Sequence, residues 1–452
     1  MSEVRNAKLV DSAVLEQAAE TALQHAKKLG ANQAEVKLSN SLGQSINVRN
    51  QALESVEVHN DRSMSINVYR NHCSGSASTA DFSDQGIQSA VEAAVSIAKQ
   101  TEADDCFGLA DKALLAASNI DSTVLNQNHP WDASIGDLIE IAQQCEQAGF
   151  DVDKRVNNTE GVAVNTYAGI SLYANSDGFT GSSLGTSHSM SCSLIAQQDQ
   201  DMQRDYWYSS NCNPNLLETA ETIGAKAGQR TVRRLGGRQI ESCQVPVLFE
   251  APLASSLISH LVSSILGGAL YKKASFMQDR LGEQIFPEWI NIDENPHLAG
   301  EYRSAFYDNE GVATPEKRSI IENGQLVSYV LSSFTSRKLN MQTTANAGGL
   351  RNVIITQTGE SLNELIAKMH TGFLVTELIG SSVNIVTGDY SRGASGFWIE
   401  NGETQYAVQE VTVAGNLLDM FQGISAVGSD TDERNNIKTG SILLDKLTVA
   451  GA

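Results

Sequence analysis

The chain has 452 residues and a formal net charge of −21, with 53 acidic residues against 32 basic ones. Its length predicts two or three domains rather than a single core. The excess of acidic residues repels a polyanion, so we expect no direct binding of nucleic acid.

Hydrophobic residues make up 41% of the chain, which is typical of a folded globular protein. No apolar run reaches the roughly 18 residues that span a membrane, and the N-terminal residues lack the continuous apolar core of a secretion signal. The six cysteines are widely spaced and form no CxxC pair, so neither a disulfide framework nor a zinc ribbon is indicated. We therefore expect a soluble cytoplasmic protein with reduced thiols and no membrane contact.

Residues 1–115 are predicted to form an N-terminal α/β domain. Apolar residues at three- and four-residue spacing indicate a helix between Asp11 and Gly30. Short alternating runs such as "AEVKLS", "QSINVRN", "ESVEVHN" and "MSINVYRN" predict an antiparallel meander of short strands. A second helix is expected at about 84–100.

Residues 116–240 are predicted to form a central α+β domain. A helix around 134–148 precedes several strand-like segments, and Asp177-Gly178 signals a hairpin turn between two of them. A further helix, at about 215–235, ends in a basic cluster of Arg230, Arg233 and Arg234. A helix dipole favours cations at that end, so a structural role suffices for the cluster.

Residues 241–452 are predicted to form a β-rich C-terminal domain, which makes the whole chain an α+β protein. A strand at 245–250 is followed by an apolar helix candidate at 253–270, and then mainly by strands and glycine turns. Glu-Asn-Gly occurs at 322–324 and at 400–402, and each Asn-Gly predicts a tight hairpin. We interpret Glu322 and Glu400 as solvated turn residues rather than catalytic acids.

The apolar helix carries one histidine, His260, which is the first candidate for chemistry. A zinc-binding pair on a helix needs a second ligand one turn later, but the residue four positions on is Ser264 and the next is Ile265. Leu261 stands where a general-base glutamate would follow. We expect His260 to be packed and hydrogen-bonded without a metal of its own. No GxSxG elbow or Walker A loop offers a different site.

The segment "VTGDYSRGASGFWIENG", residues 386–402, is the densest glycine cluster. Glycines let the backbone turn sharply or let another chain come close. A bend between core strands is the simpler interpretation, and a wall of a peptide-binding groove is the alternative. The residues concerned are Gly388, Asp389, Ser391, Gly393 and Gly396.

Several segments in their order along the chain resemble the TldD/PmbA family, described as modulators of DNA gyrase. They include "NTEGVAVN", "YANSDGF", "DNEGV", "HLVSSILGGALYKKASFMQDRLG", "GDYSRGASGFWIENG", "TVAGNLLDM" and "VGSD". The resemblance runs from about residue 10 to the C-terminus and is closest to the PmbA branch, also called TldE.

The resemblance implies a metalloprotease, whose TldD branch carries a His-Glu-x-x-x-His helix and a C-terminal cysteine that look like a zinc site. Laid on this chain, the four positions fall on His260, Leu261, Ile265 and a residue near Thr439, so only the first is kept. The resemblance thus implies a non-catalytic subunit without a cofactor of its own, paired with a zinc-bearing TldD-type chain and able to form homo-oligomers when alone.

Small or unfolded polypeptides are the implied substrates, since the family is associated with antitoxin degradation and with maturation of a peptide antibiotic. Two other classes of function stay open: a self-sufficient hydrolase, and a regulatory protein that binds DNA gyrase or an antitoxin without cleaving it.

Overall fold

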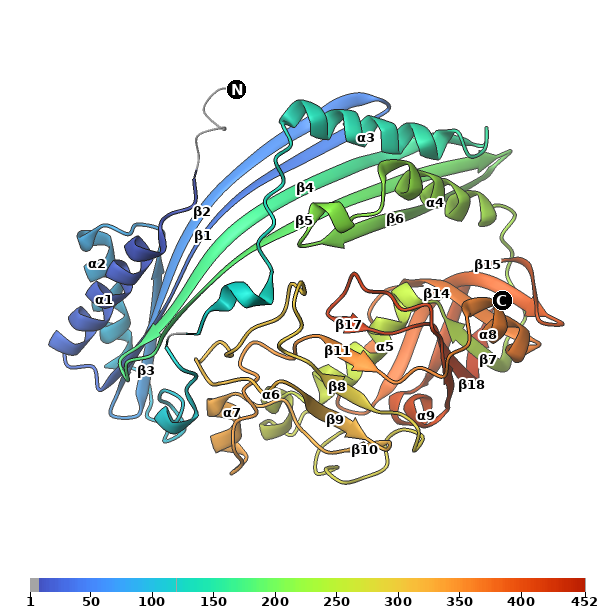
Figure 1. Cartoon of the computed structure of the whole chain (residues 1–452). Coiled ribbons are helices and arrows are strands. Elements are labelled where there is room, and N and C mark those ends of the chain that lie inside the picture. The colour runs from blue at the N-terminus through green and yellow to red at the C-terminus, as the bar shows by residue number, and fades with distance from the viewer. Residues whose placement is uncertain (1–7, 119, 452) are drawn as a thin grey trace.

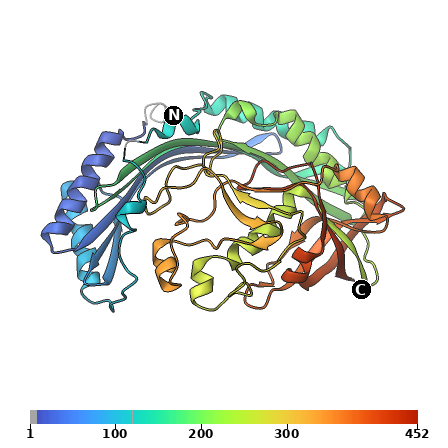
Figure 2. The same ribbon diagram turned by 60° about the horizontal axis from the view of Figure 1, so that its bottom comes forward.

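One long antiparallel sheet dominates the first half of the chain in the computed structural model, which describes residues 8–118 and 120–451. The sheet arches over the C-terminal half of the protein, as the two views in Figure 1 and Figure 2 show. Its strand order is β3-β2-β1-β4-β5-β6, so the first two predicted units contribute to a single sheet. The strands are β1 (Gln33–Arg49), β2 (Ala52–Arg70), β3 (Cys73–Thr79), β4 (Val156–Asn175), β5 (Thr180–Gln198) and β6 (Asp201–Asn211).

The prediction of several short strands before residue 80 was wrong, because β1 and β2 each run unbroken through two of the expected segments. The "NSLGQ" sequence at 40–44 reads as a break, but β2 and β4 pair with β1 on both sides throughout it. Gly43 is needed there for space, since a Cβ would lie 2.8 Å from the Tyr167 ring. The Asp177-Gly178 turn between β4 and β5 was predicted correctly.

Helices cover the outer face of the arch at its two ends (Figure 1). Alternate residues of β1 supply both cores: Val36 and Leu38 pack under the first helix pair, and Ile46 and Val48 under the second. The predicted helices of this half are confirmed within a few residues. They are α1 (Ser12–Lys28), α2 (Asp84–Ala98), α3 (Ile135–Phe150) and α4 (Ala220–Arg233), with short 3-10 turns η2 (Lys112–Leu114), η3 (Ser122–Leu125) and η4 (Pro214–Leu216).

The C-terminal half contains two further sheets that share the largest hydrophobic core. In one sheet β12 pairs with both β7 and β14, so that β12, β7, β18, β15 and β14 close into a ring. Its strands are β7 (Cys243–Phe249), β12 (Gly372–Ile379), β13 (Val383–Asn384), β14 (Asp389–Glu400), β15 (Glu403–Asn416), β16 (Ile424–Val427) and β18 (Ile442–Ala450). The smaller sheet has β8 (Ile292–Glu294), β9 (Arg318–Glu322), β10 (Gln325–Leu326), β11 (Val353–Ile355) and β17 (Ile437–Lys438).

The helices of this half are short, and together with the strands they confirm the α+β class. They are α5 (Ala251–Ser264), α6 (Gly267–Tyr271), α7 (Ser333–Lys338), α8 (Leu362–Met369) and α9 (Leu417–Gln422). The single helix predicted at 253–270 was wrong. The chain leaves the helical conformation after Ser264, where Leu266 is extended and bridges Val330. Gly267 then lies so close to Thr335 that a Cβ would meet its side chain at 2.4 Å.

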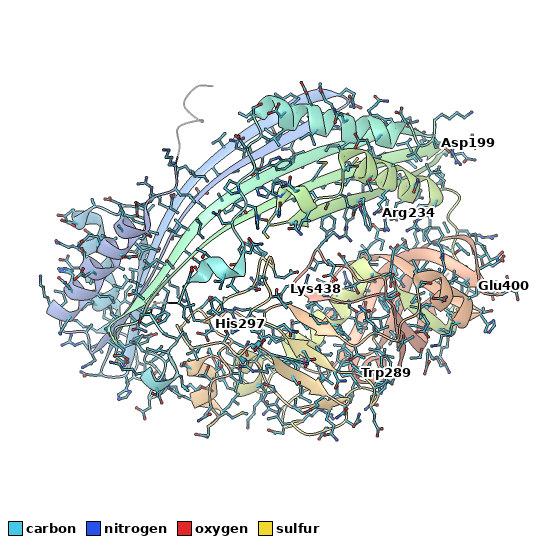
Figure 3. The ribbon with its side chains drawn as sticks, in the orientation of Figure 1. Asp199, Arg234, Trp289, His297, Glu400 and Lys438 are labelled. Atoms are coloured by element: carbon cyan, nitrogen blue, oxygen red, sulfur yellow. The ribbon has the colours of Figure 1, made fainter. Side chains whose placement is uncertain are left out.

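Both Glu-Asn-Gly hairpins are present. Asn323 and Asn401 have φ values of 48° and 55°, and each following glycine also has positive φ. The backbone of the type I′ turn requires this at both central positions. Glu322 and Glu400 are exposed, and Glu400 lies at the outer edge of the molecule in Figure 3.

The basic cluster at the end of α4 connects the arch to the C-terminal half through ion pairs, most of them largely buried. Arg230 Nη1 lies 3.0 Å from Glu250 Oε2, and Arg230 Nε lies 3.4 Å from Asp205 Oδ1. Arg233 pairs with Glu250, and Arg234, labelled in Figure 3, pairs with Glu377. The cluster is therefore structural, although carboxylates rather than a helix dipole neutralise it.

None of the helices in the described part of the chain combines the length and the hydropathy needed to cross a bilayer. The prediction that the N-terminal residues form no secretion signal involves residues 1–7, which lie outside the ranges that the structure describes.

Candidate functional site

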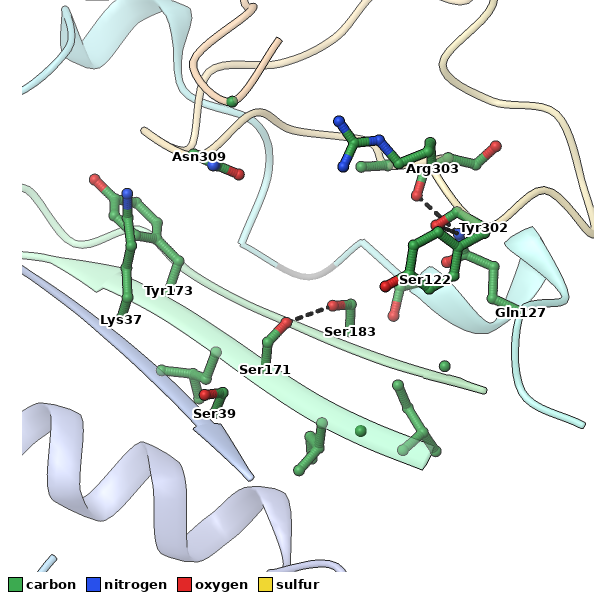
Figure 4. Close-up of a pocket in the computed structure, with 18 of the residues that line it drawn as sticks. Lys37, Ser39, Ser122, Gln127, Ser171, Tyr173, Ser183, Tyr302, Arg303 and Asn309 are labelled. Atoms are coloured by element: carbon green, nitrogen blue, oxygen red, sulfur yellow. Dashed lines mark hydrogen bonds between the residues drawn. The ribbon is translucent and has the colours of Figure 1, made fainter. Parts of the chain in front are cut away.

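A cavity of about 610 Å³ lies between the inner face of the arch and a loop of the C-terminal half. The close-up in Figure 4 shows strands of the sheet forming one wall and the segment around residues 302–309 forming the other. This volume is within the range of sites that bind small molecules or a few residues of a peptide.

The sheet wall is lined with small hydroxyl side chains. Ser63 is opposite Ser39, Ser39 is opposite Ser171, and Ser171 is opposite Ser183, so four strands place serines in one row. The hydroxyls of Ser171 and Ser183 lie 2.7 Å apart. Because successive residues of a strand face opposite sides, four apolar neighbours of these serines point into the outer core under α1 and α2: Leu38, Met64, Ile170 and Leu172. The wall can offer hydrogen bonds without filling the space in front of it.

The opposite wall is held in shape by a buried carboxylate. Asp308 is 1% exposed, and its two oxygens accept hydrogen bonds from the backbone N–H groups of Glu310, Val312 and Ala347 at 2.8–3.0 Å. Burial raises the pKa of the Asp308 carboxyl above its usual value, while those three N–H groups oppose the rise. This aspartate begins the "DNEGV" segment, and its hydrogen bonds fix the shape of the loop.

A second buried carboxylate orients a tyrosine at the end of the cavity. Glu35 accepts hydrogen bonds from the hydroxyls of Tyr173 and Tyr69 at 2.8 and 2.9 Å. Burial raises the pKa of the Tyr173 hydroxyl, and the charge of Glu35 raises it further. Tyr173 is therefore a fixed, neutral donor to Glu35 rather than a proton-transfer group.

His260 lies on α5 and not in this cavity. Its ring packs edge-on against Tyr390, with 5.9 Å between ring centroids. The expected hydrogen bond is absent: the Nε2 atom is buried and has no hydrogen-bond partner among the described residues. Burial lowers the pKa of His260, and the nearby charge of Arg392 lowers it further, which keeps the ring neutral.

The other three positions of the zinc motif supply no metal donors. Leu261 and Ile265 are both 0% exposed and belong to the largest hydrophobic core. Thr439 is equally buried, and its hydroxyl donates to the carbonyl oxygen of Gly440. Within residues 8–118 and 120–451, no group of three or more His, Cys, Asp or Glu side chains is placed to hold a metal ion. The residues at these positions do not fit the zinc ion that the motif would bind.

The glycine-rich segment forms the end of the turn before β14, β14 itself and the start of the turn after it. It lines neither the cavity under the arch nor the smaller one beside Trp131. At Gly396 a Cβ would lie 1.8 Å from the Leu374 carbonyl oxygen of β12, and at Gly393 it would lie 3.3 Å from Ile379 Cβ. These glycines allow β12 to approach β14 closely. Gly388 has a positive φ of 83° in the turn before β14, and Asp389 and Ser391 are exposed. A role of this segment in a substrate groove stays a prediction.

Most residues that line the cavity belong to no recognisable motif; the exceptions are Tyr173 in "YANSDGF", and Asp308 and Asn309 in "DNEGV". The available signal was the alternation of serine with apolar residues along the strands, which predicts a half-buried sheet face but not the loop that closes over it.

Comparison with known proteins agrees with this architecture. Models of the PmbA/TldA metallopeptidases match three consecutive stretches: domain 1 at residues 34–98, the central domain at 128–235 and the C-terminal domain at 242–451. The metalloprotease PmbA of Escherichia coli O157:H7 is 43% identical over 97% of this chain and 96% of its own length.

Two crystal structures share the fold over nearly the whole chain. A candidate modulator of DNA gyrase from Bacteroides thetaiotaomicron has a TM-score of 0.91 at 26% identity, covering 97% of this chain and 99% of its own. TldE from Thermococcus kodakarensis has a TM-score of 0.83 at 21% identity, covering 96% of this chain and 100% of its own. The chain thus belongs to the PmbA/TldA metallopeptidase family.

Proposed function

We propose that this chain is the non-catalytic, PmbA/TldE-type subunit of a cytoplasmic heteromeric metalloprotease. A homologous TldD-type subunit would supply the zinc ion, and the pair would cleave small or unfolded polypeptides. This chain would contribute a wall of the substrate chamber and a surface for its partner.

The observation that carries the proposal is the pattern at the expected metal site. Whole-chain similarity to a metalloprotease is combined with apolar residues, Leu261 and Ile265, where the base and the second ligand would stand. A buried apolar pair cannot coordinate a metal or transfer a proton. Metal-activated water would therefore have to come from another chain.

The cavity supports a role in holding the substrate. An extended polypeptide presents many backbone hydrogen-bonding groups, and the serine row of the sheet wall offers hydroxyls that can pair with them. Small side chains recognise backbone rather than sequence, which suits varied unfolded substrates.

Regulatory binding without proteolysis is the second candidate, favoured by the fold shared with a candidate modulator of DNA gyrase. Retention of gyrase subunits or of an antitoxin by the purified chain, without any TldD-type chain in the sample, would support it.

The deciding experiment mixes the purified chain with the TldD-type protein of the same host and follows cleavage of an unfolded polypeptide. We expect cleavage and one zinc-bearing chain in the mixture, and no cleavage by this chain alone. Equal rates for the chain alone and for the mixture would show that it is a self-sufficient hydrolase.

A further inference from the structure

The charges inside the cavity are opposite in sign to those of the whole chain. Four charged side chains line it: Lys37, Arg303, Arg351 and Asp308. Asp308 is already bound by three backbone N–H groups of its own loop. A chain with a net charge of −21 therefore keeps three cations around one cavity.

These cations have no carboxylate in direct contact. No ion pair among the described residues involves Lys37, Arg303 or Arg351. The arginines at the end of α4, in contrast, are all paired with carboxylates. Arg303 is exposed, and its side chain makes no hydrogen bond to any residue that the structure describes. Lys37 rises from the sheet wall beside the Tyr173 ring, and Arg303 extends from the opposite loop (Figure 4).

Arg351 is the most informative of the three because it is only 7% exposed. A guanidinium has five N–H donors, but among the described residues its side chain makes one hydrogen bond, from Nη1 to the Gly349 carbonyl oxygen at 3.2 Å. Burial lowers the pKa of Arg351, the negative charges of Asp308 and Glu294 oppose this, and the like charges of Arg303 and Arg318 lower it further. Arg351 and Arg303 both line the cavity.

Two arginines that line one cavity without an ion pair repel each other, and burying one of them costs free energy. The negative charges of Asp308 and Glu294 offset this cost for Arg351 only in part, since its pKa is still lowered. Structural arginines avoid this cost by pairing, as Arg230 does with Glu250. A buried arginine that faces a cavity beside a second, free arginine is instead an arrangement that a carboxylate completes with charge-assisted hydrogen bonds.

We propose that the Arg303–Arg351 pair binds a carboxylate of a polypeptide held in this cavity, with Lys37 adding attraction from the sheet wall. The carboxylate is either the C-terminal group of the peptide or an acidic side chain, and both present the same chemistry to the arginines. This inference rests on the proposed function, because it takes a polypeptide as the occupant.

The test measures fluorescence anisotropy of labelled peptides binding to the full-length chain. Three peptides share one uncharged, unstructured sequence: one ends in an amide, one ends in a free carboxylate, and one is an amide with a central Gln→Glu change. We expect at least one of the two anionic peptides to bind about tenfold more tightly than the neutral amide, with the advantage shrinking at high salt. The tighter of the two identifies the source of the carboxylate.

Arg303→Gln should abolish the advantage of the anionic peptide, and it should leave folding intact because Arg303 is exposed and unpaired. Arg351→Lys keeps the charge but loses the planar donor fork, so it should also reduce the advantage. Arg62→Gln is the matched control, since Arg62 is exposed on β2 and lines neither cavity. The inference is overturned if no peptide binds, if all three bind equally, or if the preference survives both cavity variants.

Incubating the same peptides with the TldD-type partner separates this inference from the proposed function. Cleavage that ignores peptide charge, together with equal binding, would leave the protease proposal standing and remove the carboxylate site. Preferential binding of an anionic peptide without cleavage of any peptide would do the reverse.

Discussion

Helix α5 and the cavity under the arch differ in what fills them. In α5 the position next to His260 carries Leu261, which is fully buried in the core. In the cavity, Ser171 and Arg303 face open space and are exposed. The zinc-motif position next to His260 is thus filled by a packed apolar side chain, whereas the cavity under the arch is open and lined largely with polar side chains.

The difference indicates how sensitive each kind of site is to substitution. Metal chemistry needs several donors at one point, and one apolar replacement in a packed helix already removes the site. Substrate binding needs only space and hydrogen-bonding groups, which a sheet of small residues provides. Substitutions in each region test this difference, because a change in α5 should alter the free energy of unfolding far more than a change in the cavity wall.

The largest effect is expected in α5. Leu261→Ala removes a fully buried side chain and leaves a cavity, which should lower the free energy of unfolding by about 2–5 kcal/mol. Urea denaturation of the isolated chain measures this. Val262→Ala, on the same helix but only partly buried, is the control and should cost clearly less. Equal losses would mean that α5 is not a core helix at this position.

A smaller and pH-dependent effect is expected near the cavity, at Glu310. Burial raises the pKa of its carboxyl, and the charge of Asp308 adds to the rise, so the folded state binds the proton more tightly than the unfolded state. The ionised carboxylate thus weakens the fold above this raised pKa, and the penalty disappears as pH falls below the unfolded value of about 4.3.

Glu310→Gln should therefore be more stable than the wild type at pH 7 by about 1 kcal/mol, and the difference should shrink towards pH 4. The glutamine can still accept the 2.8 Å hydrogen bond from the Ser333 backbone N–H. Thermal unfolding across this pH range measures the effect, with the exposed Glu316→Gln as control. A difference that grows as pH falls would contradict the assigned direction of the pKa shift.

The sequence was sufficient for most of the local elements and for the identity of the residues at the zinc-motif positions. Helix periodicity and Asn-Gly turns depend on neighbouring residues, and the replacements at Leu261 and Ile265 can be read directly. The length of β1 could not be predicted, because "NSLGQ" stays extended only through pairing with β2 and β4.

The cavity depends on contacts between distant parts of the chain. Arg303 and Arg351 lie 48 positions apart and face strands more than 100 residues earlier in the sequence. Nothing in the pattern around either arginine distinguishes it from a paired one such as Arg230. The absence of a hydrogen bond at His260 Nε2 could not be predicted either, because the atoms around this nitrogen come from parts of the chain that are distant in sequence.

The smallest effect is expected at the sheet wall. Ser171→Ala removes only the 2.7 Å contact with the Ser183 hydroxyl at an exposed position, so the free energy of unfolding should change by about 0.5 kcal/mol or less. Differential scanning calorimetry would show almost unchanged melting. A loss as large as that of Leu261→Ala would mean that the wall is part of the core rather than a surface kept for a ligand.

The most direct test of the division of labour is His260→Ala in the reconstituted complex with the TldD-type subunit. Because His260 has no hydrogen-bond partner among the described residues and packs only against its neighbours, its loss should cost about 1 kcal/mol of stability. The complex should keep its zinc and cleave an unfolded substrate within about tenfold of wild type, equivalent to ~1.4 kcal/mol in the barrier. The matching change at the first histidine of the partner's motif should abolish cleavage. A His260→Ala complex that stays folded and assembled but loses both zinc and activity would show that His260 reaches into a shared metal site, and would contradict a non-catalytic role for this chain.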